Sequence, residues 1–99
     1  MVESIEKALE QADMTIDDVS LFIPHQSNIR MIRAVCEQVG LRDESRIANN
    51  IERVGNTSAA SIPIVLDECV RAGKLESGDV LLLTSVGSGM TYGSVLIHW

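Results

Sequence analysis

The sequence has few aromatic residues, few cysteines and no long hydrophobic stretch, and each shortage excludes a class of protein. Aromatic residues make up only 3% of the 99 residues and apolar residues 45%, so we expect an aliphatic core of the kind usual in α/β domains. The two cysteines have neither metal-ligand spacing nor the pattern of a disulfide framework. No apolar run is long enough to span a membrane, and the N-terminus does not resemble a signal peptide. We therefore expect one small cytoplasmic domain without a metal site.

Basic residues are also scarce, which argues against polyanionic partners. Eight Lys and Arg residues stand against 14 Asp and Glu residues, for a formal net charge of −6. A negative field repels phosphate backbones and anionic lipids, so we expect neither nucleic-acid nor membrane binding. The basic residues are nevertheless clustered, because five of the eight are Arg30, Arg33, Arg42, Arg46 and Arg53. Four acids share that stretch, so any basic patch is local.

Helical spacing of apolar residues predicts three helices. In residues 2–13, apolar residues recur at helical spacing with mostly acidic residues between them. Residues 27–39 also have apolar residues on one helical face, with Ser27 or Asn28 as the predicted N-cap. A third helix is predicted to follow the capping residues 55–58 and to continue through about residue 72. Cys36 and Cys69 fall on the apolar stripes of the second and third helices. We interpret both thiols as packed and unreactive, because buried apolar cysteines are inert.

Strands are predicted between these helices. Residues 19–23 form a short β-rich run that ends at a proline, and residues 80–86 have the aliphatic content of a strand covered on both faces. Residues 92–99 follow after a short connection that favours an antiparallel hairpin. Residues 47–54 are ambiguous, and a short strand is one interpretation. We expect an α/β fold with a mixed, mostly parallel sheet of about four strands that ends in an antiparallel pair.

Three motifs lie just beyond strand ends or at helix starts, where α/β sheets usually bind ligands. They are Pro24-His25-Gln26-Ser27-Asn28-Ile29-Arg30, Gly55-Asn56-Thr57-Ser58-Ala59-Ala60-Ser61 and Gly87-Ser88-Gly89-Met90-Thr91-Tyr92-Gly93. Three motifs in order are far more specific than any one alone. Together they resemble the β-ketoacyl-acyl-carrier-protein synthase III family of condensing enzymes. The resemblance implies one half of a thiolase-like fold, with residues 1–99 as the C-terminal domain and the cysteine-bearing N-terminal half absent.

The resemblance also implies a reaction, the decarboxylative condensation of an acyl-CoA with malonyl-acyl-carrier protein in fatty acid biosynthesis. His25 and Asn56 match the positions whose N–H groups stabilise the enolate. Without their motifs, His25 would be interpreted as a histidine bonded to a backbone carbonyl and Asn56 as a helix cap. The motifs favour catalysis for both residues, and Asn56 can serve in both roles.

Two further groups of positions are implied to contact the substrates. Gly87, Ser88 and Gly89 match the loop that presents a backbone N–H to the acyl-cysteine carbonyl. Ser88 stands where relatives usually have glycine. The alternative, non-functional interpretation of this loop is a simple hairpin turn. Asn28 and Arg30 match positions that contact the pantetheine arm and the carrier protein. The arginines at 33, 42 and 46 are interpreted as ordinary solvated charges.

The resemblance implies no cofactor, since coenzyme A and carrier-protein thioesters are substrates. The implied partners are the absent N-terminal half, acyl carrier protein and a second copy in a homodimer. Because covalent catalysis requires the absent thiol, we expect the isolated chain to be inactive. Two other interpretations stay open: a non-catalytic binding or assembly subunit of a thiolase-fold complex, and a condensing enzyme of secondary metabolism.

Overall fold

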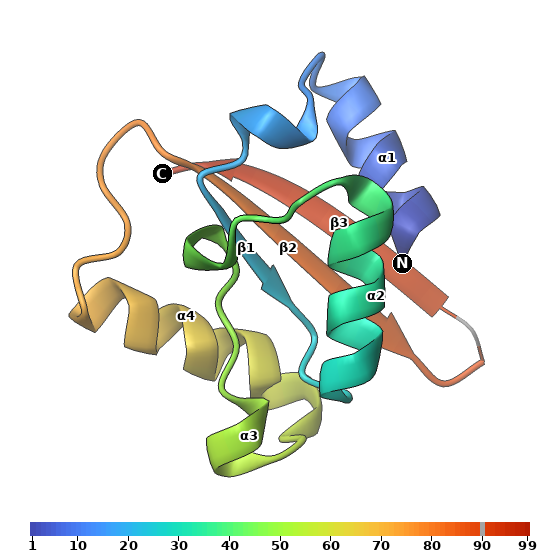
Figure 1. Cartoon of the computed structure of the whole chain (residues 1–99), viewed down its shortest axis with the longest axis vertical. Helices are drawn as coiled ribbons and strands as arrows, with labels where there is room; N and C mark the ends of the chain where they lie inside the picture. The colour runs from blue at the N-terminus through green and yellow to red at the C-terminus, as the bar shows by residue number, and fades with distance from the viewer. Residues whose placement is uncertain (90) are drawn as a thin grey trace.

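The computed structural model describes residues 1–89 and 91–99, so Met90 of the third motif lies outside the described residues. A central sheet is covered by α1 and α2 on one face and by α4 on the other (Figure 1). The helices and strands, in chain order, are α1 (Val2–Gln11), β1 (Leu21–Pro24), α2 (Ile29–Val39), α3 (Ile51–Val54), α4 (Ser61–Arg71), β2 (Val80–Gly87) and β3 (Thr91–His98). Short 3₁₀ turns occupy Ile16–Asp18, Glu44–Arg46 and Ser58–Ala60.

The sheet has the strand order β1-β2-β3, with β1 and β2 parallel and β2 and β3 antiparallel. The register runs from Leu21 opposite Leu81 in the parallel pair, and from Val80 opposite His98 in the hairpin. The predicted mixed sheet with a terminal antiparallel pair is confirmed. The carboxyl ends of β1 and β2 lie side by side, with Pro24 opposite Thr84, which brings the residues that follow them to one edge.

The described residues form three strands, where about four were predicted, and the sheet is not mostly parallel. Residues 47–54 account for the difference, because Ile47 makes only an isolated parallel bridge to Phe22. The chain then leaves the sheet: the backbone N–H groups of Asn50 and Ile51 donate to the Gln26 side chain, and α3 begins at Ile51. The buried Gln26 side chain thus accepts the hydrogen bonds that these two N–H groups would donate to a neighbouring strand within a sheet.

Alternating residues of the strands form two hydrophobic clusters, as the pleat of a sheet requires. Phe22 and Leu82 face α1 and α2, whereas Ile23 and Leu81 face α4. These four side chains are fully buried. The second helix begins at the cap predicted for it, because the Asn28 side chain accepts a hydrogen bond from the Met31 N–H at 2.8 Å. None of the helices in the described part of the chain has the length and apolar content needed to cross a membrane.

Arg46 holds the segment before β1 in place, in contrast to its interpretation as a solvated charge. Its guanidinium donates to the Val19 carbonyl, with the Nε contact at 2.8 Å, and to the Ile16 carbonyl at 2.6 Å. Both carbonyls belong to the connection between α1 and β1. Sequence reasoning missed this contact because 27 and 30 residues separate the partners.

We expect Arg46→Ala to lower the free energy of unfolding by about 1.5–3 kcal/mol, the range for hydrogen bonds that involve a charged group. Urea unfolding followed by circular dichroism measures the loss. The exposed Arg42 is a matched control, and Arg42→Ala should change stability by less than about 0.5 kcal/mol. Equal effects of the two substitutions would show that Arg46 contributes no more than a surface charge.

Candidate functional site

The three motifs meet in one hollow with a volume of about 650 Å³, which we call the motif hollow. Its wall is formed by the residue after β1, by the segment before α4 and by the facing ends of β2 and β3. The lining residues are His25, Asn56, Ser58, Ala59, Ser85, Val86, Gly87, Ser88, Thr91, Tyr92 and Gly93. The structure therefore brings together four of the predicted site residues: His25, Asn56, Gly87 and Ser88.

His25 is half-buried, and its backbone N–H and its ring each take part in a hydrogen bond. Its backbone N–H donates to the Thr84 carbonyl of β2 at 2.7 Å, which continues the pairing of β1 with β2. Its ring Nδ1 lies 2.8 Å from the Ser61 hydroxyl oxygen. The ring of His25 thus bonds to a side chain at the start of α4. The non-catalytic interpretation expected a bond to a backbone carbonyl instead. Among the described residues, the ring Nε2 has no hydrogen-bond partner.

Asn56 is exposed, and its side-chain oxygen is already engaged. The Ser58 N–H donates to Asn56 Oδ1 at 2.8 Å, which assigns the other side-chain atom as the NH₂ group. Asn56 does not cap α4, whose N-cap is Ala60. The preceding Gly55 has φ 73° and ψ −167°, a combination essentially restricted to glycine. This turn directs the chain into Asn56, whose NH₂ group has no hydrogen-bond partner among the described residues.

Gln26 is the main functional feature that sequence reasoning missed. It is fully buried, and its amide Nε2 donates to the Pro24 carbonyl at 2.8 Å. Its Oε1 accepts the backbone N–H groups of Asn50 at 2.9 Å and Ile51 at 3.1 Å. Gln26, which follows His25, thus links the end of β1 to the start of α3. From α3 the chain continues to Asn56. The only sequence signal is its position inside the first motif.

The contacts extend from Asn50 to α4. Asn50 Nδ2 donates to Glu68 at 2.8 Å, and Glu68 forms an ion pair with Arg53 at 2.7 Å. The hydrogen bond from Arg53, followed by that from Asn50, lowers the pKa of the Glu68 carboxyl below its ordinary value of 4.5. The carboxylate form of Glu68 therefore helps to hold α3 against α4.

A lowered pKa in the folded state means that Glu68 stabilises the fold above its ordinary pKa and loses this effect as the pH falls toward the folded-state value. We expect Glu68→Gln to lower the melting temperature at pH 7, and the difference from the unsubstituted chain to shrink below about pH 4.5. Thermal unfolding across pH 3–7 measures it. Asp67→Asn, which breaks the exposed pair with Arg71, is the matched control. A pH-independent difference would contradict the assignment.

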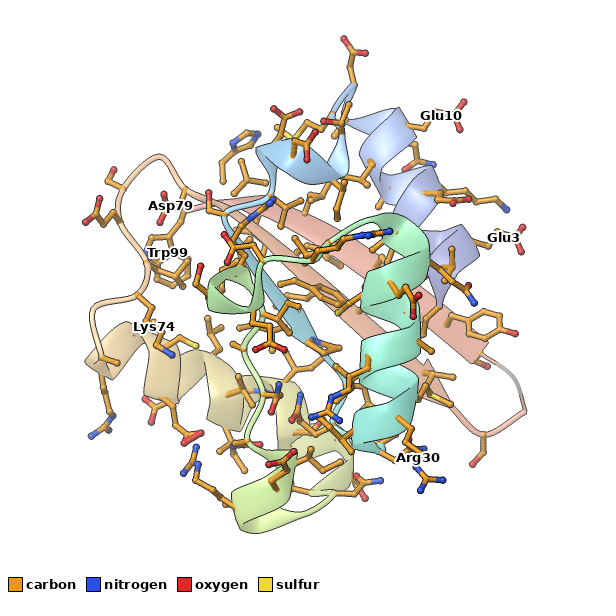
Figure 2. The ribbon with its side chains drawn as sticks, viewed as in Figure 1. Glu3, Glu10, Arg30, Lys74, Asp79 and Trp99 are labelled. Carbon is orange, nitrogen blue, oxygen red and sulfur yellow. The ribbon has the colours of Figure 1, made fainter. Side chains whose placement is uncertain are left out.

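The remaining predicted residues lie outside the motif hollow. Gly89 is not among its lining residues. Asn28 is the N-cap of α2, and Arg30 lies in the first turn of that helix. Arg30 is exposed and points outward from α2 (Figure 2). The other arginines are largely engaged: Arg33 pairs with Glu52 at 3.8 Å and Arg53 with Glu68.

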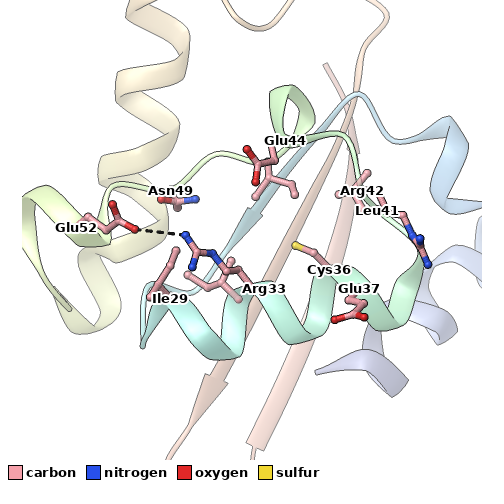
Figure 3. A pocket seen from close by; sticks show the side chains of 11 residues that line it. Ile29, Arg33, Cys36, Glu37, Leu41, Arg42, Glu44, Asn49 and Glu52 are labelled. Carbon is pink, nitrogen blue, oxygen red and sulfur yellow. Dashed lines mark ion pairs between the residues drawn. The ribbon is translucent and has the colours of Figure 1, made fainter.

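A second hollow, of about 480 Å³, lies between α2 and the segment of residues 41–52, and the Arg33–Glu52 pair crosses its edge (Figure 3). Cys36 lines it but is only 5% exposed, and burial raises the pKa of its thiol to about 11. Burial also raises the pKa of Cys69. Both thiols are therefore protonated at neutral pH, which agrees with their interpretation as core residues. Among the described residues, no three His, Cys, Asp or Glu side chains gather as metal ligands would.

Known proteins match this chain along its whole length. Residues 9–99 match the sequence model of the family described as 3-oxoacyl-[acyl-carrier-protein (ACP)] synthase III C terminal. All 99 residues align with β-ketoacyl-[acyl-carrier-protein] synthase III of Desulfotalea psychrophila at 48% identity and with that of Aquifex aeolicus at 44%. The chain spans only 30% and 32% of those two proteins.

Crystal structures give the same result. The structure of 3-oxoacyl-[acyl-carrier-protein] synthase III from Aquifex aeolicus VF5 superposes with a TM-score of 0.96 at 44% identity. The superposition covers the whole of this chain and 32% of the Aquifex aeolicus protein. The corresponding enzyme from Pseudomonas aeruginosa PAO1 superposes with a TM-score of 0.93 at 40% identity, with 30% of that protein covered. The three-stranded sheet and its helices therefore have the thiolase-like fold of about one third of those two proteins.

Proposed function

The chain belongs to the 3-oxoacyl-[acyl-carrier-protein] synthase III family and corresponds to its C-terminal region, and from this premise we propose that it supplies two N–H donors to a condensing active site. The donors are His25 Nε2–H and the Asn56 NH₂ group. The intact protein is proposed to condense an acyl-CoA with malonyl-acyl-carrier protein in fatty acid biosynthesis. The observation that carries the proposal is that both residues line one hollow with their other side-chain polar atoms already engaged.

The proposed chemistry needs donors at the point where negative charge develops. The carbon–carbon bond to the malonyl carboxylate breaks, carbon dioxide leaves, and the electron pair forms an enolate on the thioester. The enolate carbon then attacks the acyl-thioester carbonyl, and the cysteine thiolate leaves. Two fixed N–H groups stabilise the enolate oxygen without reorganising during the reaction. Neither His25 nor Asn56 must move a proton for this role.

Gly87 and Ser88 line the same hollow at the end of β2 and are proposed to bind the acyl carbonyl through a backbone N–H. Serine at position 88 fits this turn, because the left-handed backbone conformation falls on Gly89, with φ 78°. Positive φ is the conformation that glycine adopts at least cost, and Ser88 is not among the positive-φ residues. Ser88 therefore adds a side chain beside the hollow without a positive φ of its own.

The nucleophilic cysteine is proposed to come from the part of the intact protein that this chain does not include. The chain spans about a third of its relatives, and both of its cysteines are buried. Substrates are proposed to be coenzyme A and carrier-protein thioesters, without a separate cofactor. Asn28 and Arg30, exposed at the start of α2, are proposed to contact the pantetheine arm and the acidic carrier protein. A homodimer is proposed for the intact enzyme.

A chimera tests this function. The first two thirds of the Aquifex aeolicus enzyme are fused to this chain in place of its own C-terminal third, which is 44% identical and superposes closely. Condensation of acetyl-CoA with malonyl-acyl-carrier protein is then measured against the parent enzyme. We expect turnover within about tenfold of the parent, which corresponds to about 1.4 kcal/mol of transition-state stabilisation. A folded chimera without turnover would favour a binding or assembly role.

A further inference from the structure

The Ser61 side chain joins the two residues at the end of β1. It is the first residue of α4 and only 1% exposed. Its Oγ lies 2.8 Å from His25 Nδ1, and it accepts the backbone N–H of Gln26 at 3.3 Å. In the sequence, Ser61 is simply the last residue of the second motif, 36 positions away from His25. Its contact with the ring gives it a second role besides starting α4.

The Ser61 hydroxyl has a single proton, and this determines the direction of its hydrogen bond with the His25 ring. A serine hydroxyl has one proton to donate and two lone pairs to accept with. The Gln26 N–H uses one lone pair, so the Ser61 proton is directed to His25 Nδ1, the partner within reach. In the opposite direction, Nδ1–H would donate to Ser61 and leave a buried hydroxyl proton without a partner, which is costly. The first arrangement satisfies all three groups.

We infer that Ser61 is a positioning residue that fixes the neutral His25 ring in the tautomer with its proton on Nε2. In neutral imidazole, the nitrogen that accepts a hydrogen bond determines where the proton resides. With Nδ1 accepting from Ser61, the N–H is on Nε2, for which the described residues provide no hydrogen-bond partner. The tautomer follows from the geometry alone, whereas its effect on the reaction rests on the proposed function of His25.

Asn56 is arranged by the same principle. Its acceptor atom is occupied by a backbone N–H of the chain, just as the acceptor atom of His25 is occupied by Ser61. In both residues the remaining polar atom is a donor. Ser61 also lies at the end of a helix whose Val65 and Cys69 pack against β1, so its position is determined by the core. The hollow therefore presents two donors and no competing side-chain acceptor from these residues.

The tautomer is tested by ¹⁵N NMR of the histidine rings in this chain at pH 8.5, where a free histidine is neutral. We expect His25 to show an unprotonated Nδ1 and a protonated Nε2 as one set of signals. Ser61→Ala should move both ring nitrogens toward intermediate shifts, as two tautomers exchange, whereas the exposed His98 should be unchanged. A protonated Nδ1 in the unsubstituted chain, or identical rings in Ser61→Ala, would overturn the inference.

Ser20→Ala is the matched control, because the Ser20 hydroxyl also accepts a backbone N–H, that of Val80, but at the opposite end of β1. It should have a similar effect on stability and none on the His25 signals. Ser61→Thr retains the hydroxyl and should keep the Nε2–H tautomer if the chain folds. A shift of the His25 signals in Ser20→Ala as large as in Ser61→Ala would mean that general loosening, and not the Ser61 hydroxyl, controls the ring.

Kinetics of the chimera connect the tautomer to the reaction. We expect Ser61→Ala to lower kcat about 10- to 100-fold with KM little changed, the range known for groups that orient a metal-bound histidine through its other nitrogen. Ser61→Thr should recover most of the rate. If the tautomer changes in Ser61→Ala and kcat does not, the proposed donor role of His25 fails while the tautomer assignment stands. If neither changes, Ser61 only packs.

Discussion

His25→Ala and Asn56→Ala are each expected to lower kcat for malonyl decarboxylation by the chimera about 100- to 1000-fold. The reason is that each substitution removes one N–H donor from the enolate oxygen, and a donor of this kind contributes about 3–4 kcal/mol to the transition state. KM should change little, because the interaction is made mainly after carbon dioxide begins to leave. Release of labelled carbon dioxide from malonyl-acyl-carrier protein measures the rate.

Isosteric substitutions separate donor loss from a change of shape. Asn56→Asp keeps the oxygen that accepts the Ser58 N–H but replaces the NH₂ group with a second oxygen, so it should be at least as inactive as Asn56→Ala. His98→Ala removes the other histidine, which is exposed on β3, and should leave the rate unchanged. The double substitution of His25 and Asn56 should cost less than the product of the two single effects, because both donors act on one oxygen. Single substitutions that change the rate less than tenfold would contradict the paired-donor site.

Gln26→Ala is expected to lower the free energy of unfolding by about 3–5 kcal/mol. It leaves the N–H groups of Asn50 and Ile51 and the Pro24 carbonyl without the Gln26 side chain as partner, and it opens a cavity where the Gln26 side chain is fully buried. Total stabilities of small domains are only about 5–15 kcal/mol, so the loss is a large fraction of the whole. Urea unfolding followed by circular dichroism measures it.

Gln38 provides the matched control for Gln26, because it is exposed on α2. Gln38→Ala should change stability by less than about 0.5 kcal/mol, since alanine is also a good helix former. Gln26→Glu keeps an acceptor for the two N–H groups but buries a carboxylate beside the Pro24 carbonyl, so it should be destabilising as well. A cost below about 1 kcal/mol for Gln26→Ala would show that water or a local shift satisfies the exposed backbone groups.

The features that sequence reasoning predicted depend on local patterns or on the three motifs. The hairpin of β2 and β3 follows from two β-rich runs with a short connection, and the start of α2 from Asn28 ahead of an apolar stripe. The convergence of His25, Asn56 and the Gly87 segment follows from the motifs and from parallel strands that end at one edge. The first two inferences need only neighbouring residues, whereas the third needs the motifs and the geometry of a sheet.

The features that were missed all depend on partners far apart in the chain. Residues 47–54 are ambiguous in the sequence, with a short strand as one interpretation, but the buried Gln26 side chain accepts the N–H groups of Asn50 and Ile51 and the chain turns into α3. Arg46 looks like a surface charge until the carbonyls of Ile16 and Val19 are placed beside it. Ser61 falls within the helix predicted after residues 55–58, and only the fold places its hydroxyl against the His25 ring. Helical and strand spacing, which relates neighbouring residues, does not reveal such pairs.

The most direct test of the central claim mixes this chain with a separately produced first two thirds of the Aquifex aeolicus enzyme, which carries the remainder of the fold. Condensation of acetyl-CoA with malonyl-acyl-carrier protein is measured for each part alone and for the mixture. The paired-donor account predicts turnover in the mixture only, and its loss with His25→Ala or Asn56→Ala. Turnover by this chain alone, or none in a mixture whose parts demonstrably fold and associate, would contradict it.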